Sequence, residues 1–183
     1  MDPWQFSFTG VDPADERRRE ALCTLGNGYF ARRGAAPESR ADATHYPGTY
    51  VAGCYNRLTS TVAGRPLEHE SLVNMPNWLP LTFRIGEGPW FALDAVEPLS
   101  HELRLDLERG VLTRLVRFRD AYGRTTRMVQ RRFVHLRMPH LAGLETTLVA
   151  EDWSGRITFR GGIDGDVTND GVERYRALEG RHL

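Results

Sequence analysis

Hydrophobic and polar residues alternate along most of the second half of the chain. In the segment 103–107, leucines take every second position and charged residues lie between them. The same alternation runs over 111–119 and places Leu112, Val116 and Phe118 on one face. A period of two residues is typical of a β-strand with one buried face. We therefore predict strands over both segments.

More strands follow toward the C-terminus, each separated from the next by a short turn. Alternating patterns occupy the segments 125–136, 144–150 and 157–163. The turn between the strands predicted at 111–119 and 125–136 opens with Asp120 and closes with Gly123, as a type I turn prefers. Because no helical period intervenes, these strands are expected to form an antiparallel meander.

The first half of the chain is less regular. Short strands are expected at 4–8, 29–33, 49–55 and 79–85. The segment 35–47 is polar and bounded by prolines, which favours a loop. Asp12 and Pro13 suit the cap and the first position of a helix over 12–22, and Gly26 is expected to end this helix.

These elements predict one all-β domain over residues 1–183, with one short N-terminal helix. No internal repeat or low-complexity linker divides the chain. So many strands bury one face each most readily as a two-sheet antiparallel β-sandwich.

Composition and charge exclude several classes of function. The 24 basic and 24 acidic residues give no net charge, whereas a nucleic-acid partner needs a basic excess, so none is expected. No apolar run is long enough to span a membrane, and the N-terminus lacks the pattern of a secretory signal. Cys23 and Cys54 belong to no C-x-x-C pair and are expected to be reduced thiols of a cytoplasmic protein.

Four motifs have a chemical interpretation that the surrounding sequence does not favour. Residues 26–31 match G-x-G-x-x-A, but a strand should precede and a helix should follow, so we predict a tight turn with Asn27 in the left-handed region. Residues 164–171 resemble a calcium loop, but Ala177 stands where a glutamate is needed, which favours an acidic surface loop.

His135 and His140 are close enough in sequence to suggest a metal site, but they have no third metal ligand nearby. Residues 68–70 pair two carboxylates, as glycoside chemistry does, although a solvated loop after Pro66 is favoured.

Asn74, Asn77 and Trp78 are the candidate substrate-binding residues. An indole face packs against the C–H bonds of a sugar ring, and amide groups bind its hydroxyls. Core packing of the tryptophan is the competing interpretation and is the favoured one.

Several motifs together resemble the N-terminal domain of glycoside hydrolase family 65. They include LGNGY at 25–29, HYPGTY at 45–50, LVNMPNW at 72–78 and EDWSG at 151–155, in that order along nearly the whole chain. The resemblance implies a large antiparallel sandwich of the galactose-mutarotase-like kind. It also implies that the family's sandwich continues beyond Leu183, so that 172–183 is a segment cut from its continuation and the sandwich is incomplete.

The resemblance also implies a division of labour. In the family, an (α/α)-barrel follows this domain, carries the glutamate that acts as general acid, and holds the inorganic phosphate that attacks the sugar with inversion. No metal or organic cofactor is needed, and no catalytic residue carries over to this chain. The substrates are α-glucoside disaccharides such as maltose, trehalose or kojibiose.

We therefore expect an N-terminal piece of an α-glucoside phosphorylase or hydrolase that is inactive alone, packs on the barrel and supports homodimer contacts. A stand-alone carbohydrate-binding sandwich is one alternative. An aldose epimerase that uses His101 and His135 with Glu145 is another. Because missing strands leave open edges, the isolated chain is expected to associate.

Overall fold

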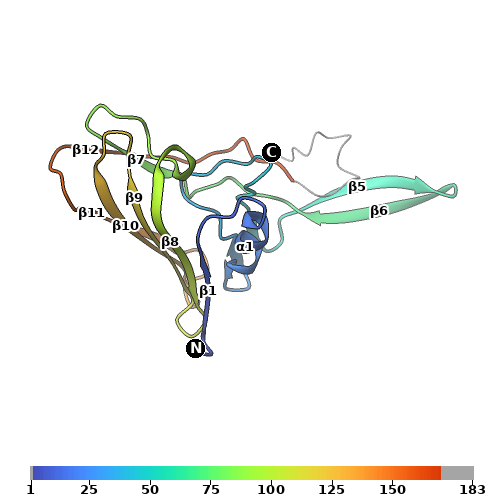
Figure 1. Cartoon of the computed structure of the whole chain (residues 1–183). Helices are drawn as coiled ribbons and strands as arrows, with labels where there is room; N and C mark the ends of the chain where they lie inside the picture. The colour runs from blue at the N-terminus through green and yellow to red at the C-terminus, as the bar shows by residue number, and fades with distance from the viewer. Residues whose placement is uncertain (1, 170–183) are drawn as a thin grey trace.

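Antiparallel strands make up most of the protein, as the computed structural model in Figure 1 shows for the described residues 2–169. The elements are β1 (Gln5–Thr9), α1 (Glu16–Leu22), β2 (Leu25–Gly26), β3 (Phe30–Arg32), β4 (Thr49–Val51), β5 (Tyr55–Val62), β6 (Arg65–Leu72), β7 (Leu81–Ile85), the 3-10 helix η1 (Leu93–Ala95), β8 (Glu97–Asp106), β9 (Val111–Arg119), β10 (Thr125–Val134), β11 (Ala142–Ala150) and β12 (Ile157–Gly161).

The main sheet has the strand order β1-β8-β9-β10-β11, and each neighbouring pair is antiparallel. The four strands from β8 to β11 follow one another in sequence, which confirms the meander for these four strands. The strand expected at 157–163 does not belong to it, because β12 pairs with β7 in a separate two-stranded sheet. The β9–β10 turn is also as expected, because Gly123 donates its backbone N–H to Asp120 and has a positive φ of 81°.

Smaller sheets cover the inner face of the main sheet. Phe83 and Ile85 of β7 pack in one apolar cluster with Val116, Phe118 and Met128 of β9 and β10. At the other end, Cys23 and Leu25 form a second cluster with residues of β8, β9 and β10. This face-to-face packing confirms an all-β sandwich, with α1 as the one α-helix among residues 2–169.

A polar row separates the two apolar clusters on the main sheet. Arg114 of β9 lies opposite Gln130 of β10, and Gln130 lies opposite Thr146 of β11. Arg114 and Gln130 are both buried, and Arg114 Nη1 donates to Gln130 Oε1 at 3.1 Å. The core is therefore two hydrophobic regions joined by a buried hydrogen-bonded strip.

The helix is shorter than the sequence predicts. It begins at Glu16, with Asp15 in the cap position, and it ends at Leu22. Asp12 instead accepts a hydrogen bond from the backbone N–H of Ala14 in the turn before the helix. Gly26 does not end the helix, because it already lies in β2.

The hairpin β5–β6 was not expected. The strand predicted over 49–55 ends at Val51, and residues 68–70 lie in strand β6 and not in a solvated loop. Pro66 is compatible with β6 because this strand is an edge of its two-stranded sheet, where a missing N–H breaks no ladder. In Figure 1 the hairpin projects from the rest of the chain as a long arm.

The glycine turn at 26–31 joins β2 to β3, as the favoured interpretation required. However, Gly28 takes the left-handed conformation, with φ of 86°, in place of Asn27. The Asn27 side chain instead ties the turn together, because its Oδ1 accepts from the N–H groups of Tyr29 and Phe30.

Within residues 2–169, no helix has both the length and the apolar character needed to cross a bilayer.

Candidate functional site

A cavity of about 300 Å³ lies between the start of α1, the loop from β3 to β4, and the main sheet. Its lining is unusually rich in ionisable side chains for a space next to the core. They include Glu16, Glu38, Asp42, His45, His101 and Arg114. This cavity is the main concentration of potential acid–base groups in the described part of the chain.

A buried ion pair forms one wall of the cavity. Arg114 reaches from β9 to Glu38 in the loop, with Nη2 to Oε1 at 2.7 Å and Nη1 to Oε2 at 2.9 Å. The two side chains are only 5% and 6% exposed. A bidentate pair of this kind fixes the loop against the sheet and keeps the guanidinium charge compensated.

His101 lies beside this pair and is held neutral. Its Nδ1 lies 3.1 Å from the carbonyl oxygen of Gly10, and Arg114 Nε donates to its Nε2 at 3.3 Å. Burial, with the nearby Arg114 charge as the second cause, lowers the pKa of His101 to about 4. Because both ring nitrogens are engaged, His101 is a positioned structural group and not a free general base.

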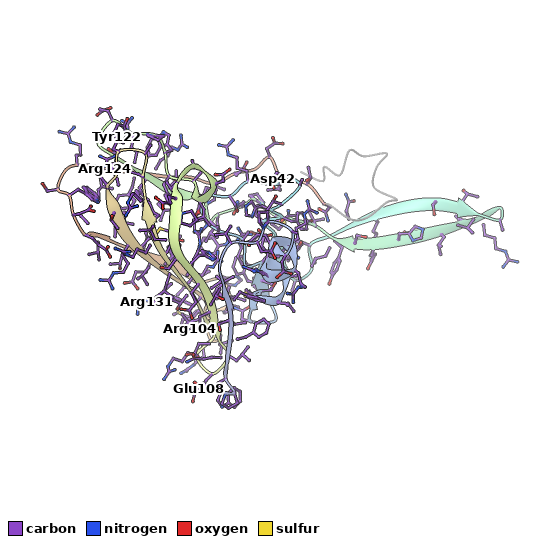
Figure 2. The ribbon with its side chains drawn as sticks, in the orientation of Figure 1. Asp42, Arg104, Glu108, Tyr122, Arg124 and Arg131 are labelled. Carbon is purple, nitrogen blue, oxygen red and sulfur yellow. The ribbon has the colours of Figure 1, made fainter. Side chains whose placement is uncertain are left out.

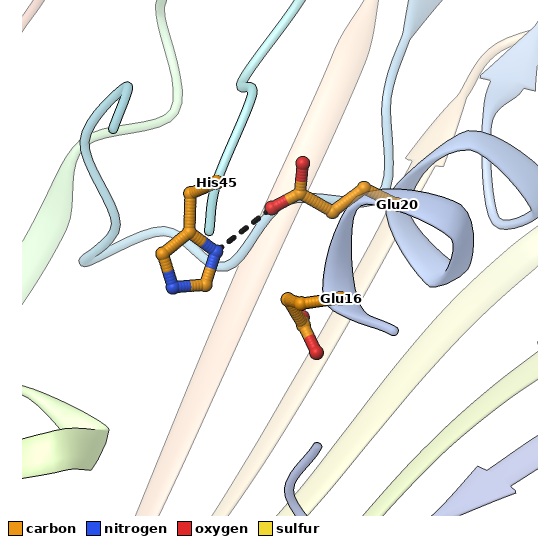
Figure 3. Close-up of side chains that lie close together, drawn as sticks. All are labelled: Glu16, Glu20 and His45. Atoms are coloured by element: carbon orange, nitrogen blue, oxygen red, sulfur yellow. Dashed lines mark hydrogen bonds and ion pairs between the residues drawn. The ribbon is translucent and has the colours of Figure 1, made fainter. Parts of the chain in front are cut away.

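Glu16, Glu20 and His45 form a second ionisable cluster (Figure 3). Glu20 is fully buried, and its two oxygens accept from His45 Nδ1 at 2.9 Å and from the backbone N–H of Tyr46 at 2.8 Å. The hydrogen bond to Glu20 raises the pKa of His45. Burial, and then repulsion by Glu20, raise the pKa of Glu16.

The cluster offers three metal-ligand atoms within 4.8 Å of one another. Two carboxylates and an imidazole are suitable ligands for a divalent transition metal. The His45 imidazole already shares a hydrogen bond with Glu20, so a metal ion would have to replace that contact. The arrangement by itself therefore supports a proton-linked contact between α1 and the loop.

The predicted binding residue Asn74 is buried, 3% exposed, and its side chain is engaged within the protein. Its Oδ1 accepts from the backbone N–H of Thr49, and its Nδ2 donates to the carbonyls of Pro47 and Thr168. Asn74 thus connects three separate segments of the chain.

Asn77 is also buried, 4% exposed, and its Oδ1 accepts from Arg32 Nη2 and from the backbone N–H of Leu79. Trp78 is half-buried, and its ring centroid lies 6.2 Å from that of Phe30. The indole Nε1 is buried and has no hydrogen-bond partner among the described residues. Substrate binding at Asn74, Asn77 and Trp78 stays a prediction, and the observed contacts give the two asparagines a structural role.

The three residues of the epimerase alternative do not come together. His101 faces the buried side of β8, whereas Glu145 lies on the exposed face of β11 and pairs with Arg131. His135 follows β10, where its Nδ1 accepts from the backbone N–H groups of Arg137 and Met138. The structure therefore assembles no shared cleft from them.

The remaining motifs have structural contacts. Glu68 and Glu70 are half-exposed and share Arg57 across the hairpin, at 3.4 and 2.7 Å. Asp164 pairs with the backbone of Asn77. Residues 170–177 of the possible calcium loop, and the segment 172–183, lie outside the described residues.

Sequence reasoning missed the ionisable groups around the cavity. A signal was present for Arg114, because it occupies an inward position in the strand between Leu112 and Val116. A charged residue in the buried phase of an alternating strand needs a partner elsewhere. No comparable pattern marks Glu16, Glu20 or His45, since they meet only when α1 packs against the loop.

Comparisons with known proteins give a consistent result. The sequence model described as glycosyl hydrolase family 65, N-terminal domain, matches residues 6–183. An uncharacterized glycosyl hydrolase of Mycobacterium tuberculosis (strain H37Rv) is 54% identical over 182 residues, which is 100% of this chain and 14% of that protein.

Two phosphorylases are also similar to the chain. A kojibiose phosphorylase of Halothermothrix orenii is 31% identical over 94% of this chain and 21% of its own length. A trehalose 6-phosphate phosphorylase of Lactococcus lactis is 33% identical over 90% of this chain and 21% of its own length. The chain thus spans only 14–21% of the length of these relatives.

A solved chain assigned as a kojibiose phosphorylase from the human microbiome has a TM-score of 0.77 and 18% sequence identity. The structural match covers 86% of this chain and 21% of the solved chain. At this identity the likeness shows the fold.

Proposed function

Because the chain belongs to glycosyl hydrolase family 65, as its N-terminal domain, we propose that it is the non-catalytic N-terminal part of an α-glucoside phosphorylase or hydrolase. In this proposal a following (α/α)-barrel supplies the general acid and, in a phosphorylase, the site for inorganic phosphate. The substrate is an α-glucoside disaccharide such as maltose, trehalose or kojibiose.

One observation carries the proposal: the family match covers residues 6–183, while the relatives are several times longer than this chain. The chemistry of the cavity supports a non-catalytic role. Its best-placed histidine is held neutral with both nitrogens engaged, and its buried arginine is paired with Glu38.

The proposed role of the domain is to pack on the barrel, to help shape the entrance to the substrate site and to support a homodimer. Trp78 and its neighbours Asn74 and Asn77 are the proposed contribution to carbohydrate binding. A cytoplasmic location is part of the proposal, and it is supported by two cysteines that form no disulfide within the described residues. Neither a metal ion nor an organic cofactor enters the proposed reaction.

The experiment compares the full-length protein with residues 1–183. Release of glucose 1-phosphate, or of glucose, from maltose, trehalose and kojibiose is measured with and without phosphate. We expect activity in the full-length protein and none in residues 1–183. Turnover by residues 1–183 would contradict the proposal. Disaccharide binding by residues 1–183, with no activity in the full-length protein, would favour the carbohydrate-binding alternative.

A further inference from the structure

The hairpin β5–β6 stands apart from the rest of the described chain. Its two strands pair with each other and with no other strand among residues 2–169. Figure 2 shows that the side chains of the remaining protein end near its root, while those of the hairpin point outward on their own. An isolated two-stranded hairpin has only marginal stability in water.

The hairpin nevertheless has a well-defined register. Ala63 and Gly64, with positive φ of 50° and 76°, form a two-residue turn, and positive φ at both central residues gives a turn that matches the right-handed twist of the flanking strands. Ser60 bonds to His69 across the strands at 2.8 Å, and Arg57 Nη2 lies 2.7 Å from Glu70 Oε1 on the other face. These contacts fix the pairing but leave both outer edges open.

Apolar side chains are exposed on both faces of the hairpin. Tyr55 and Leu72, which are 54% and 37% exposed, lie opposite each other at the root. Val62 and Leu67, 57% and 47% exposed, share the other face near the tip. Open strand edges combined with exposed apolar residues are an aggregation liability unless a partner covers them.

The polypeptide leaves the described structure at the root of this hairpin. Asn169 Nδ2 donates to the carbonyl of Leu72 at 2.7 Å, and its Oδ1 accepts from the backbone N–H of Asn74 at 2.9 Å. Residues 170–183 follow from this point, and the relatives are several times longer than this chain. The last described residue, Asn169, is thus anchored at the root of the hairpin, and a domain that follows in the same polypeptide is covalently linked to the hairpin, at a high effective concentration.

We propose that the hairpin β5–β6 is the docking arm for the catalytic domain that follows in the same polypeptide. The existence of that catalytic domain is part of the proposed function, so this inference rests on the proposed function. The arm contains Arg57, Arg65, Glu68 and Glu70, so it carries no net charge. Because these charges balance, the features offered to a partner are the exposed apolar side chains and the open strand edges, which suit an apolar surface with backbone groups for strand addition.

Hydrogen exchange followed by mass spectrometry tests the arm. Exchange in peptides covering 55–72 is compared between the full-length protein and residues 1–183 at equal concentration. We expect these amides, including those on the open edges, to exchange at least about tenfold more slowly in the full-length protein. Equal rates in the two proteins would overturn the proposal.

A second copy of the chain is the competing partner, and a concentration series identifies it. If protection in the full-length protein rises with its concentration as dimers form, the arm pairs with a copy and the proposal is wrong. If protection in the full-length protein is independent of concentration, the partner lies in the same polypeptide.

A paired substitution tests the apolar contact in the full-length protein. Val62→Thr with Leu67→Thr places β-branched threonine, which favours strands, at both positions and removes exposed apolar area near the tip. We expect at least about fivefold loss of the protection at 55–72. Leu107→Thr is the matched control, because Leu107 is equally exposed, at 54%, and neighbours Glu108 at the far end of the main sheet in Figure 2. Equal effects of the paired substitution and the control would overturn the proposal.

The outcome is separable from that of the proposed function. A full-length protein that protects the hairpin but cleaves no α-glucoside disaccharide supports the docking arm and refutes the proposed activity. An active full-length protein with an unprotected hairpin supports the proposed activity and refutes the docking arm.

Discussion

Removal of the Glu38 carboxylate should destabilise the protein strongly, because it leaves the Arg114 charge buried without its partner. The two side chains are almost inaccessible and make two short contacts of 2.7 and 2.9 Å. The remaining neighbours of the guanidinium, Gln130 and His101, are neutral groups at 3.1 and 3.3 Å. They can accept hydrogen bonds but cannot offset the charge.

Breaking a buried ion pair on one side typically costs about 3–5 kcal/mol. For a domain of this size, each kcal/mol lowers the melting temperature by about 2–4 °C. We therefore expect Glu38→Ala to lose about 3–5 kcal/mol of unfolding free energy, and to melt about 6–20 °C lower. Glu38→Leu combined with Arg114→Met should recover most of this loss, because it removes both charges from the core.

The assay is urea unfolding of residues 1–183 at submicromolar concentration, followed by tryptophan fluorescence. Glu145→Ala is the control, since Glu145 and Arg131 form an ion pair on the same sheet but are 58% and 57% exposed. An exposed pair contributes about 0.2–1 kcal/mol. If Glu38→Ala costs no more than Glu145→Ala, the reasoning about the buried strip is refuted.

Three other predictions concern protonation, thiol reactivity and association. The bond to Glu20 raises the pKa of His45, so its stabilisation is present below pH 6.5 and is lost as the pH rises through the folded-state pKa. Burial lowers the pKa of His101 to about 4, so this residue instead costs stability as the pH falls from 6.5 toward 4. Melting temperatures measured from pH 4 to 8 should therefore change in opposite senses in His45→Gln and His101→Gln, and an unchanged profile in either variant would contradict its assignment. Burial also raises the pKa of the Cys23 thiol to about 11, so alkylation at pH 7.5 should modify the half-buried Cys54 well before Cys23, and the reverse order by peptide mapping would refute this. Residues 1–183 should associate as their concentration rises, because the hairpin edges are open, and a monomeric mass by light scattering across the micromolar range would contradict this.

The sequence predicts the main sheet well because that sheet has one buried face. The strand expected at 111–119 is β9, Val111–Arg119, and the inward residues Leu112, Val116 and Phe118 are all 1% exposed. Burial on one face imposes the alternation from which the strand is predicted.

The hairpin β5–β6 escaped prediction for the complementary reason. Neither of its faces packs against the core, so burial imposes no alternation on its strands. Pro66 then favoured a loop, although an edge strand tolerates it. Its two-residue turn also lacks the usual sequence signal, since Ala63 takes a left-handed conformation that asparagine or glycine would adopt more easily.

The ionisable groups of the cavity depend on contacts that no local pattern encodes. Glu38 and Arg114 are 76 positions apart, and Glu20 and His45 are 25 apart. The candidate residues of 74–78 were, by contrast, located from their local composition. The structure places their amides in contacts that a composition argument does not reveal, such as the link from Asn74 to Thr168.

Complementation tests the central claim most directly. The remainder of the full-length protein, beginning after residue 183, is produced separately and assayed for cleavage of α-glucoside disaccharides with and without residues 1–183. The account predicts that residues 1–183 are inactive alone and raise the activity of the remainder when added. Full activity of the remainder without them, or activity in residues 1–183 alone, would contradict the claim that this chain is a non-catalytic domain on which the catalytic domain depends.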